Sequence, residues 1–558
     1  MKKTIFSTIL FILFLLFIAI SYLSFFGYET DRFNQIIKSE IKKSNKDITL
    51  DFEKISILLD IKKLTLFTKF INTNLNYSSI SIPLRSLRAD VELNSLIKKK
   101  PGIKKIILVT EYLDLDSKKI KPLIKKLNLQ EKNFKNIKNV RFNSTFQLEF
   151  DEDLKIKDNF KVKGTINYAN IKILDEYQAR DLYTEFFYEK DNLELKNLSW
   201  RFNNVARKDI KWGIHGDHGI YGDLKIKLAK KKYDIDAAFR TKIPIALNFI
   251  KTPGINYSFS EKNTSQIKTK FSINKNKTTF FKIFRLEDKD NEFQIKGLHL
   301  DKNYNLINFK EIKVKTSVDN NINNDFKIIN KKKKIDIQGK IFDAKILIKN
   351  LTKDGKKNNF LKKISKDIEI DFNRILKDEK FPIKNFRLVG KINKGAFEKI
   401  SAKSDFLNNK HLDISLQKQE KTDTKILEVH SDIAMPLLSD YKFFQGLEGG
   451  NLIYVSTFNK KNSSNFLTIN NFKLNKAPAL AKLLTLADLK GLTDTLRGEG
   501  ISFETLAINY ETSPLKIDVK EIFMIGPSIS ILIEGYVEKK SGLVSLRGTL
   551  VPAKFLNS

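Results

Sequence analysis

Most of the chain beyond residue 46 alternates apolar and polar residues at a period of two. Residues 48–53 alternate Ile, Leu and Phe with Thr, Asp and Glu, and similar short runs return at 161–168, 225–228 and 335–341. Each run is bounded by Asn, Asp, Gly or Lys, which is typical of strands joined by hairpins. Such alternation gives a strand one apolar face and one wet face. The pattern therefore predicts a mainly β protein.

The alternation continues for most of residues 47–558, without a long helical segment or a Pro- or Gly-rich linker. A compact sandwich rarely grows to this size. We therefore expect one long, twisted, antiparallel β-sheet, or a few such sheets in series. Helices are too few to cover its apolar face, so the sheet either curls over that face or another molecule, such as a lipid acyl chain, covers it. The expected result is a curled sheet that forms an apolar groove.

Three short helices are expected to interrupt this pattern. Asp31 to Lys43 places four apolar residues on one helical face, and Pro436–Phe444 and Pro478–Lys490 also have helical spacing. In the last two, proline lies near the start and glycine follows the end, which is normal helix punctuation. We expect these two to plug the open side of the sheet rather than to form a binding site. The apolar face of the first helix comprises Phe33, Ile36, Ile37 and Ile41.

The last predicted hairpin supplies the candidate groove residues. Residues 528–534 alternate Ile529, Ile531 and Ile533 with Ser528, Ser530 and Glu534, and the following turn is expected at 539–542. Because residues two apart share a face of a strand, the three isoleucines should lie together. They are our candidates for the lining of the apolar groove.

The N-terminus carries an uncharged apolar run from Ile5 to Phe26. A helix of this length crosses about 30 Å of hydrocarbon. Lys2 and Lys3 precede the run, so residues 1–4 should stay cytoplasmic. The alternative is a cleaved signal peptide, but such an apolar region is usually shorter and ends at a small-x-small site, which residues 21–27 do not offer. The sequence favours a single-pass anchor with the rest of the chain outside the cytoplasm.

The charge of +36 raises the question of a nucleic-acid partner. The chain has only 13 arginines against 88 lysines. A protein that binds nucleic-acid phosphates or bases would be expected to use arginine, whose planar guanidinium group matches phosphate and guanine. Abundant lysine instead suits a solvated surface and protected sheet edges, with some attraction to anionic lipid headgroups. We expect no nucleic-acid partner, and the lysine runs 98–100 and 331–334 should mark exposed turns or loops.

Catalytic chemistry finds little support in the chain. The absence of cysteine excludes disulfides, a thiol nucleophile and cysteine-ligated zinc. His215, Asp217 and His218 could in principle form a metal site, but their glycine-rich surroundings favour an exposed loop. No phosphate-binding loop, nucleophile elbow or zinc-protease motif occurs. We therefore predict a protein that is not an enzyme, with no cofactor, no metal and no catalytic residues.

Residues 430–558 carry several ordered motifs of helix, glycine turn and strand. This region resembles the C-terminal region of AsmA-like envelope proteins, closest to the YhdP type. Over residues 1–430 the likeness is only architectural: an anchor, a short helix and many strands. The motif residues are Pro478, Leu483, Leu484, Gly498, Gly500, Phe503, Gly526, Pro527, Gly548 and Pro552.

The resemblance implies a bridge-like lipid transfer protein with a long apolar β-groove. We expect a cytoplasmic tail at 1–4, an inner-membrane anchor at 5–26, a short helix and link at 27–46, a β-groove at 47–430 and an AsmA-like region at 431–558. Two departures from the family are Lys554, where an aromatic residue is more usual, and the stop at Ser558, where members continue. We interpret the chain as a fragment, the product of a split gene or a shortened relative, which would lack the end near the outer membrane.

Two functions follow as hypotheses. The first is a conduit in the bacterial periplasm that carries phospholipid between the inner and outer membranes, holding the acyl chains on apolar strands. The second is a non-catalytic tether or assembly factor that acts on outer-membrane or periplasmic proteins by sheet-edge pairing.

Overall fold

The protein is mainly β, with few helices. The computed structural model describes residues 2–552 except 45, 63–64, 78–79, 93–101, 120–136, 152–154, 175–176, 205–217, 230–231, 242–263, 275, 289–290, 304, 346–363, 378–381, 420–422, 439–440, 442–443, 476–480, 483 and 485–497. The 32 strands found in these residues belong to one sheet that is not closed. The chain divides into two compact units, the first made of residues 1–250 and 260–289 and the second of 251–259 and 290–558.

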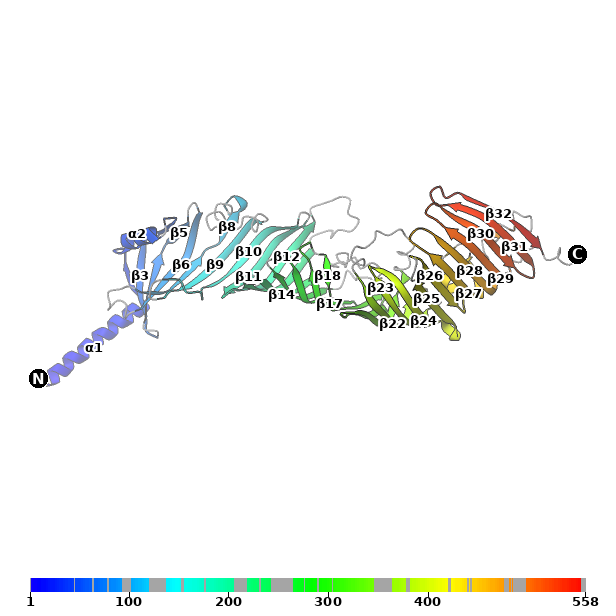
Figure 1. The fold of residues 1–558 in the computed structure, drawn as a ribbon. Coiled ribbons are helices and arrows are strands. Elements are labelled where there is room, and N and C mark those ends of the chain that lie inside the picture. The colour runs from blue at the N-terminus through cyan, green and yellow to red at the C-terminus, as the bar shows by residue number, and fades with distance from the viewer. Residues whose placement is uncertain are drawn as a thin grey trace. The chain divides into compact units, whose positions relative to one another are not determined.

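The first unit begins with helix α1 (Lys2–Phe25), whose residues 5–25 are long and apolar enough to span a membrane. Helix α2 (Asn34–Ser44) follows. Figure 1 shows α1 in blue, projecting from the start of the sheet. The strands are β1 Tyr28–Thr30, β2 Ile48–Asp51, β3 Lys54–Asp60, β4 Thr65–Ile71, β5 Thr73–Tyr77, β6 Ile80–Glu92, β7 Ile103–Thr110, β8 Leu113–Asp116, β9 Ile137–Glu149, β10 Lys161–Leu174, β11 Tyr177–Glu189, β12 Asn192–Asn204, β13 His218–Ala229, β14 Lys232–Thr241, β15 Ser265–Asn274 and β16 Thr279–Glu287.

Pairing in the first unit is antiparallel throughout the described strands. The order is β1–β3–β4–β6–β7–β9, and from β9 to β16 each strand pairs with the next along the chain. Strands β4 and β5 pair with different parts of β6, and β5 also pairs with β2. In the same way, β7 and β8 pair with different parts of β9. Successive hairpins therefore build most of this unit, as the sequence pattern predicts.

The second unit continues the meander. Its short helices are η2 (Leu407–Asn409) and α7 (Met435–Leu438). Its strands are β17 Glu292–Leu300, β18 Leu306–Asn308, β19 Glu311–Val318, β20 Asn321–Asn330, β21 Lys334–Asp343, β22 Lys366–Leu376, β23 Ile383–Asn393, β24 Ala396–Asp405, β25 His411–Lys418, β26 Lys425–Ser431, β27 Leu447–Phe458, β28 Ser463–Leu474, β29 Ile501–Thr512, β30 Lys516–Ile525, β31 Ile529–Glu538 and β32 Val544–Pro552.

One pair in the second unit departs from the expected antiparallel order. Strands β21 and β22 run parallel, with Ile337 opposite Ile370. A parallel pair needs a connection of a dozen or more residues, because the chain must return to the same end of the sheet. The segment between Asp343 and Lys366 supplies that length. The alternation inside each strand did not reveal this change of direction.

The predicted helices are only partly confirmed. Helix α2 occupies the predicted segment 31–43, although it begins at Asn34. The predicted helix 436–444 is a single turn, α7, and part of that segment lies outside the described residues. Of the predicted helix 478–490, only residues 481, 482 and 484 are described, and they are helical.

Candidate apolar binding face

One set of cross-strand neighbours runs through the whole first unit without a charged residue. Each member lies opposite the next in the strand register, from β3 through β4, β6, β7 and β9 to β16. We call this set the first rung. It consists of Ile55, Phe70, Leu87, Leu108, Phe146, Val162, Tyr188, Leu193, Ile226, Ile235, Phe271 and Phe281.

The first rung is buried at its start and half-buried along the rest. Ile55 and Leu87 are 3% and 8% exposed, in a core against which Ile37 and Ile41 of α2 also pack. From Leu108 onward every member is half-buried. The apolar face thus keeps accessible surface after α2 has covered its beginning.

Tyr188 is the only rung member of the first unit with a polar side-chain atom. Its hydroxyl donates to Asp191 Oδ1 at 3.4 Å. Burial, together with the nearby Asp191 carboxylate, raises the pKa of Tyr188 above its ordinary value. The phenol therefore stays neutral, and the rung carries no charge.

The opposite face of the same strands is charged and wet. Lys225 and Lys270 directly precede the rung members of their strands and form ion pairs across strands, with Glu194 at 3.0 Å and with Asp236 at 2.8 Å. The hydrogen bond from Lys225 holds the pKa of Glu194 below its ordinary value. The sheet of the first unit thus separates an apolar face from an ionic one.

The second unit contains a corresponding set, which we call the second rung. It passes in register from β17 to β19 and then through every strand to β32. Most members are again half-buried. The second rung consists of Ile295, Ile312, Ile328, Ile337, Ile370, Leu388, Ala402, Ile414, Val429, Tyr454, Leu467, Ile508, Ile522, Ile533 and Gly548.

The C-terminal part of the apolar face is a packed core. Ile529, Ile531 and Ile533 lie on one face of β31, as their alternation predicts, and are 0%, 2% and 8% exposed. Leu438 of α7 and Leu484 belong to the same buried cluster. The three residues chosen from the sequence therefore sit in a covered core. The second rung joins this core near its end, since Leu467 and Ile533 belong to it and Val429, Tyr454, Ile508 and Ile522 pack against it. Accessible apolar surface lies along the first rung and the earlier part of the second.

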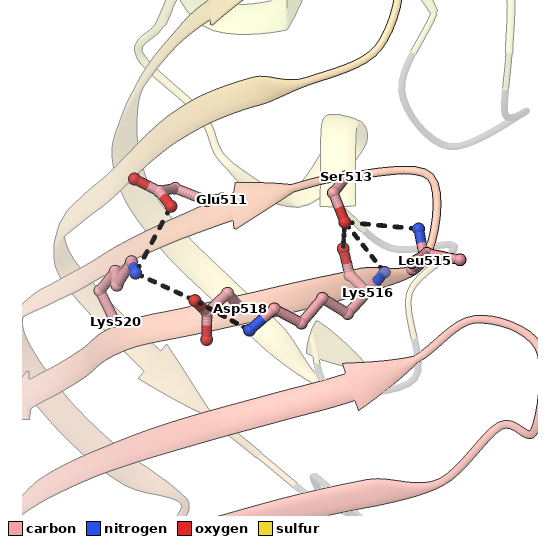
Figure 2. A network of polar contacts seen from close by, with 6 residues as sticks. All are labelled: Glu511, Ser513, Leu515, Lys516, Asp518 and Lys520. Atoms are coloured by element: carbon pink, nitrogen blue, oxygen red, sulfur yellow. Dashed lines mark hydrogen bonds and ion pairs between the residues drawn. The ribbon is translucent and has the colours of Figure 1, made fainter.

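The wet face of the second unit carries polar networks at its hairpins. Figure 2 shows Lys520 between Asp518, at 2.9 Å, and Glu511, at 3.4 Å. In the adjoining turn, Ser513 Oγ accepts hydrogen bonds from the backbone N–H groups of Leu515 and Lys516. The Lys520 hydrogen bond lowers the pKa of Asp518, and the same contact raises the pKa of Lys520.

The described family-motif residues have structural roles in the second unit. Gly500 adopts φ +85°, a left-handed conformation that favours glycine. A Cβ at Gly526 or Gly548 would lie 2.5 Å and 2.2 Å from the backbone oxygens of Ser502 and Leu532. Phe503 and Leu484 are buried, and Gly498 lies in a turn. Pro527 is exposed, and Pro552 pairs with Ile529 across strands. Pro478 and Leu483 lie outside the described residues.

The histidine cluster is largely outside the described residues. His215 and Asp217 are not described, and His218 begins β13. In the described part of the chain, no group of three or more His, Cys, Asp or Glu side chains could hold a metal ion. Residues 331–333 of the lysine run form the exposed turn between β20 and β21, as predicted, whereas Lys334 is the half-buried first residue of β21, and 98–100 is not described.

Sequence reasoning did not identify the two rungs. The runs at 161–168, 225–228 and 335–341 contain Val162, Ile226 and Ile337, so each strand's apolar face was visible. The pairing register that joins these faces was not. Register depends on which residues of neighbouring strands become hydrogen-bonded partners.

Comparison with known proteins supplies no family. No protein-family model, no curated protein and no solved structure matches this chain. The AsmA-like resemblance therefore depends only on the motifs quoted from residues 430–558.

Proposed function

We propose that this chain is a membrane-anchored, non-enzymatic periplasmic protein that carries phospholipid between the inner and outer bacterial membranes. The proposal also draws on the AsmA-like motifs. Residues 5–26 would anchor it in the inner membrane, and the acyl chains would lie along the two rungs. The single observation that carries the proposal is the uninterrupted apolar set, half-buried at most of its positions, that crosses strand after strand.

The rungs suit an acyl chain on physical grounds. Transfer of a CH₂ group from water to an apolar surface contributes about 0.8 kcal/mol. Ten such groups would contribute about 8 kcal/mol, although binding costs offset part of this. Because the rungs are neutral, an acyl chain could move from one strand to the next along their accessible parts without meeting a charge. Headgroups would remain in water.

Photo-crosslinking provides the test. A photoreactive residue at Ile226 or Ile235, both in the first rung, should capture phospholipid in cells. Matched controls on the opposite face of the same strands are Lys227 and Ala238, which are exposed. We expect lipid adducts at the two rung positions and few at the controls. Equal capture on both faces would contradict the proposal.

A sheet-edge tether is the second candidate. Among the described strands, β32 pairs with β31 alone, and its Val544 and Leu546 are 56% and 48% exposed. An unpaired edge can add a strand from another protein. Photoreactive residues in β32 that yield protein adducts, with no lipid captured at Ile226 or Ile235, would favour this function over lipid transfer.

A further inference from the structure

The apolar stripe of α2 is wider than the sheet beneath it can cover. Ile37 and Ile41 pack against the core that contains Leu50. Next to them, Phe33, which directly precedes the helix, and Ile36, in its first turn, are 47% and 61% exposed. The Phe33 carbonyl accepts a hydrogen bond from the Ile37 N–H at 3.0 Å, so the first helical turn places Phe33 beside Ile36 and Ile37, three and four residues further on. The helix thus presents a second apolar strip to something outside the sheet.

This strip lies close in the chain to the end of the candidate membrane helix. Gly27, at φ +74°, ends α1 with its N–H donating to Tyr22 O at 3.0 Å. Tyr22 and Tyr28 are exposed around this turn. Tyrosine is enriched at membrane–water interfaces. Five peptide steps separate Tyr28 from Phe33, so their Cα atoms are at most about 19 Å apart.

The charge of α2 favours an anionic surface. Three lysines against one glutamate give the helix a net charge of +2. Lys42 and Lys43 form its last turn, and Lys43 keeps 71% of its side chain exposed although it contacts Glu40. Lysines near a membrane surface are attracted to anionic headgroups.

We propose that α2 lies on the surface of the membrane that α1 crosses, with Phe33 and Ile36 inserted at headgroup level and the lysines beside anionic lipids. The membrane is favoured as the occupant because the strip is continuous in the chain with a fully exposed apolar helix. This contact would fix the first strands of the sheet at the bilayer. The inference depends on α1 spanning the membrane and is independent of lipid transfer.

Fluorescence quenching in lipid nanodiscs tests the inference with the full-length chain. The chain has no cysteine, so a single cysteine can carry an environment-sensitive NBD probe. Phe33→Cys and Ile36→Cys are the test positions. Phe14→Cys, within α1, is the hydrocarbon reference, and Leu515→Cys, 76% exposed at a hairpin, is the water reference.

Probes at 33 and 36 should be blue-shifted and quenched most by headgroup-labelled lipid, as expected for a helix buried about 5–10 Å into the interface. The probe at 14 should be quenched most by deep acyl-chain labels, and the probe at 515 by neither. Replacing zwitterionic with anionic lipid should increase quenching at 33 and 36.

Three results would contradict the inference. If probes at 33 and 36 behave like the probe at 515 while 14 is quenched, α2 does not touch the membrane. If 14 is also unquenched, α1 does not span it and the basis is lost. If anionic lipid does not increase quenching at 33 and 36, the lysines do not draw α2 to the membrane.

Discussion

At the scale of single residues, burial separates apolar side chains that look alike in the sequence. Ile531 and Ile226 are both apolar strand residues that face inward. Ile531 is 2% exposed in a packed core, whereas Ile226 is half-buried in the first rung. We therefore expect the two isoleucines to contribute differently to stability, because only Ile531 is fully enclosed by other side chains.

A matched pair of truncations tests this difference. Ile531→Ala should lower the free energy of unfolding by about 2–5 kcal/mol, because it leaves a cavity in a packed core. Ile226→Ala should cost clearly less, since its side chain already meets solvent. Denaturant unfolding followed with a probe in each unit would measure both. Equal losses would show that the rung is as enclosed as the core.

The pKa of Asp518 offers a second residue-scale prediction. The hydrogen bond from Lys520 lowers this pKa, so the favourable contact is fully present above the unfolded-state pKa of Asp and is lost as pH falls through the lower folded value. Lys520→Gln should therefore raise the pKa of Asp518 toward its ordinary value. NMR titration of labelled aspartate would measure this, with Lys516→Gln as the comparison. An unchanged Asp518 pKa in Lys520→Gln would refute the assignment.

At the scale of elements, single strands were predictable and their pairing was not. The alternation at 335–341 correctly predicted β21, and glycine and lysine marked the turn at 539–542, where Gly542 N–H donates to Glu538 O at 2.9 Å. The parallel partner of β21 was missed because alternation is the same in either strand direction. Helix α2 was predicted, but the division of its apolar stripe between sheet and solvent depends on the shape of the surface beneath it.

At the scale of the whole molecule, both units repeat one arrangement: an apolar rung on one face and ion pairs or polar networks on the other. This repetition predicts that lipid transfer would require both rungs. If acyl chains pass along them in series, a charge in either unit should block transfer. Burying an unpaired carboxylate against an acyl chain costs free energy.

Ile235→Asp in the first rung and Ile370→Asp in the second should each abolish lipid transfer in cells. Lys227→Asp and Val389→Asp, on exposed positions of the opposite face, are the matched controls. Protein level and protease resistance would show that each variant folds. Transfer that survives a charge in one rung, in a folded variant, would mean that this unit is not part of the path.

The sequence by itself determined the β class, the apolar N-terminal helix, the position of α2 and many turns, because these follow from local periodicity, charge and glycine placement. The tertiary structure alone decided which apolar faces join into rungs, where those faces are packed and where they stay half-exposed. It also decided that Ile529, Ile531 and Ile533 belong to a core. These properties depend on register and on contacts between residues far apart in the chain, which no single strand encodes.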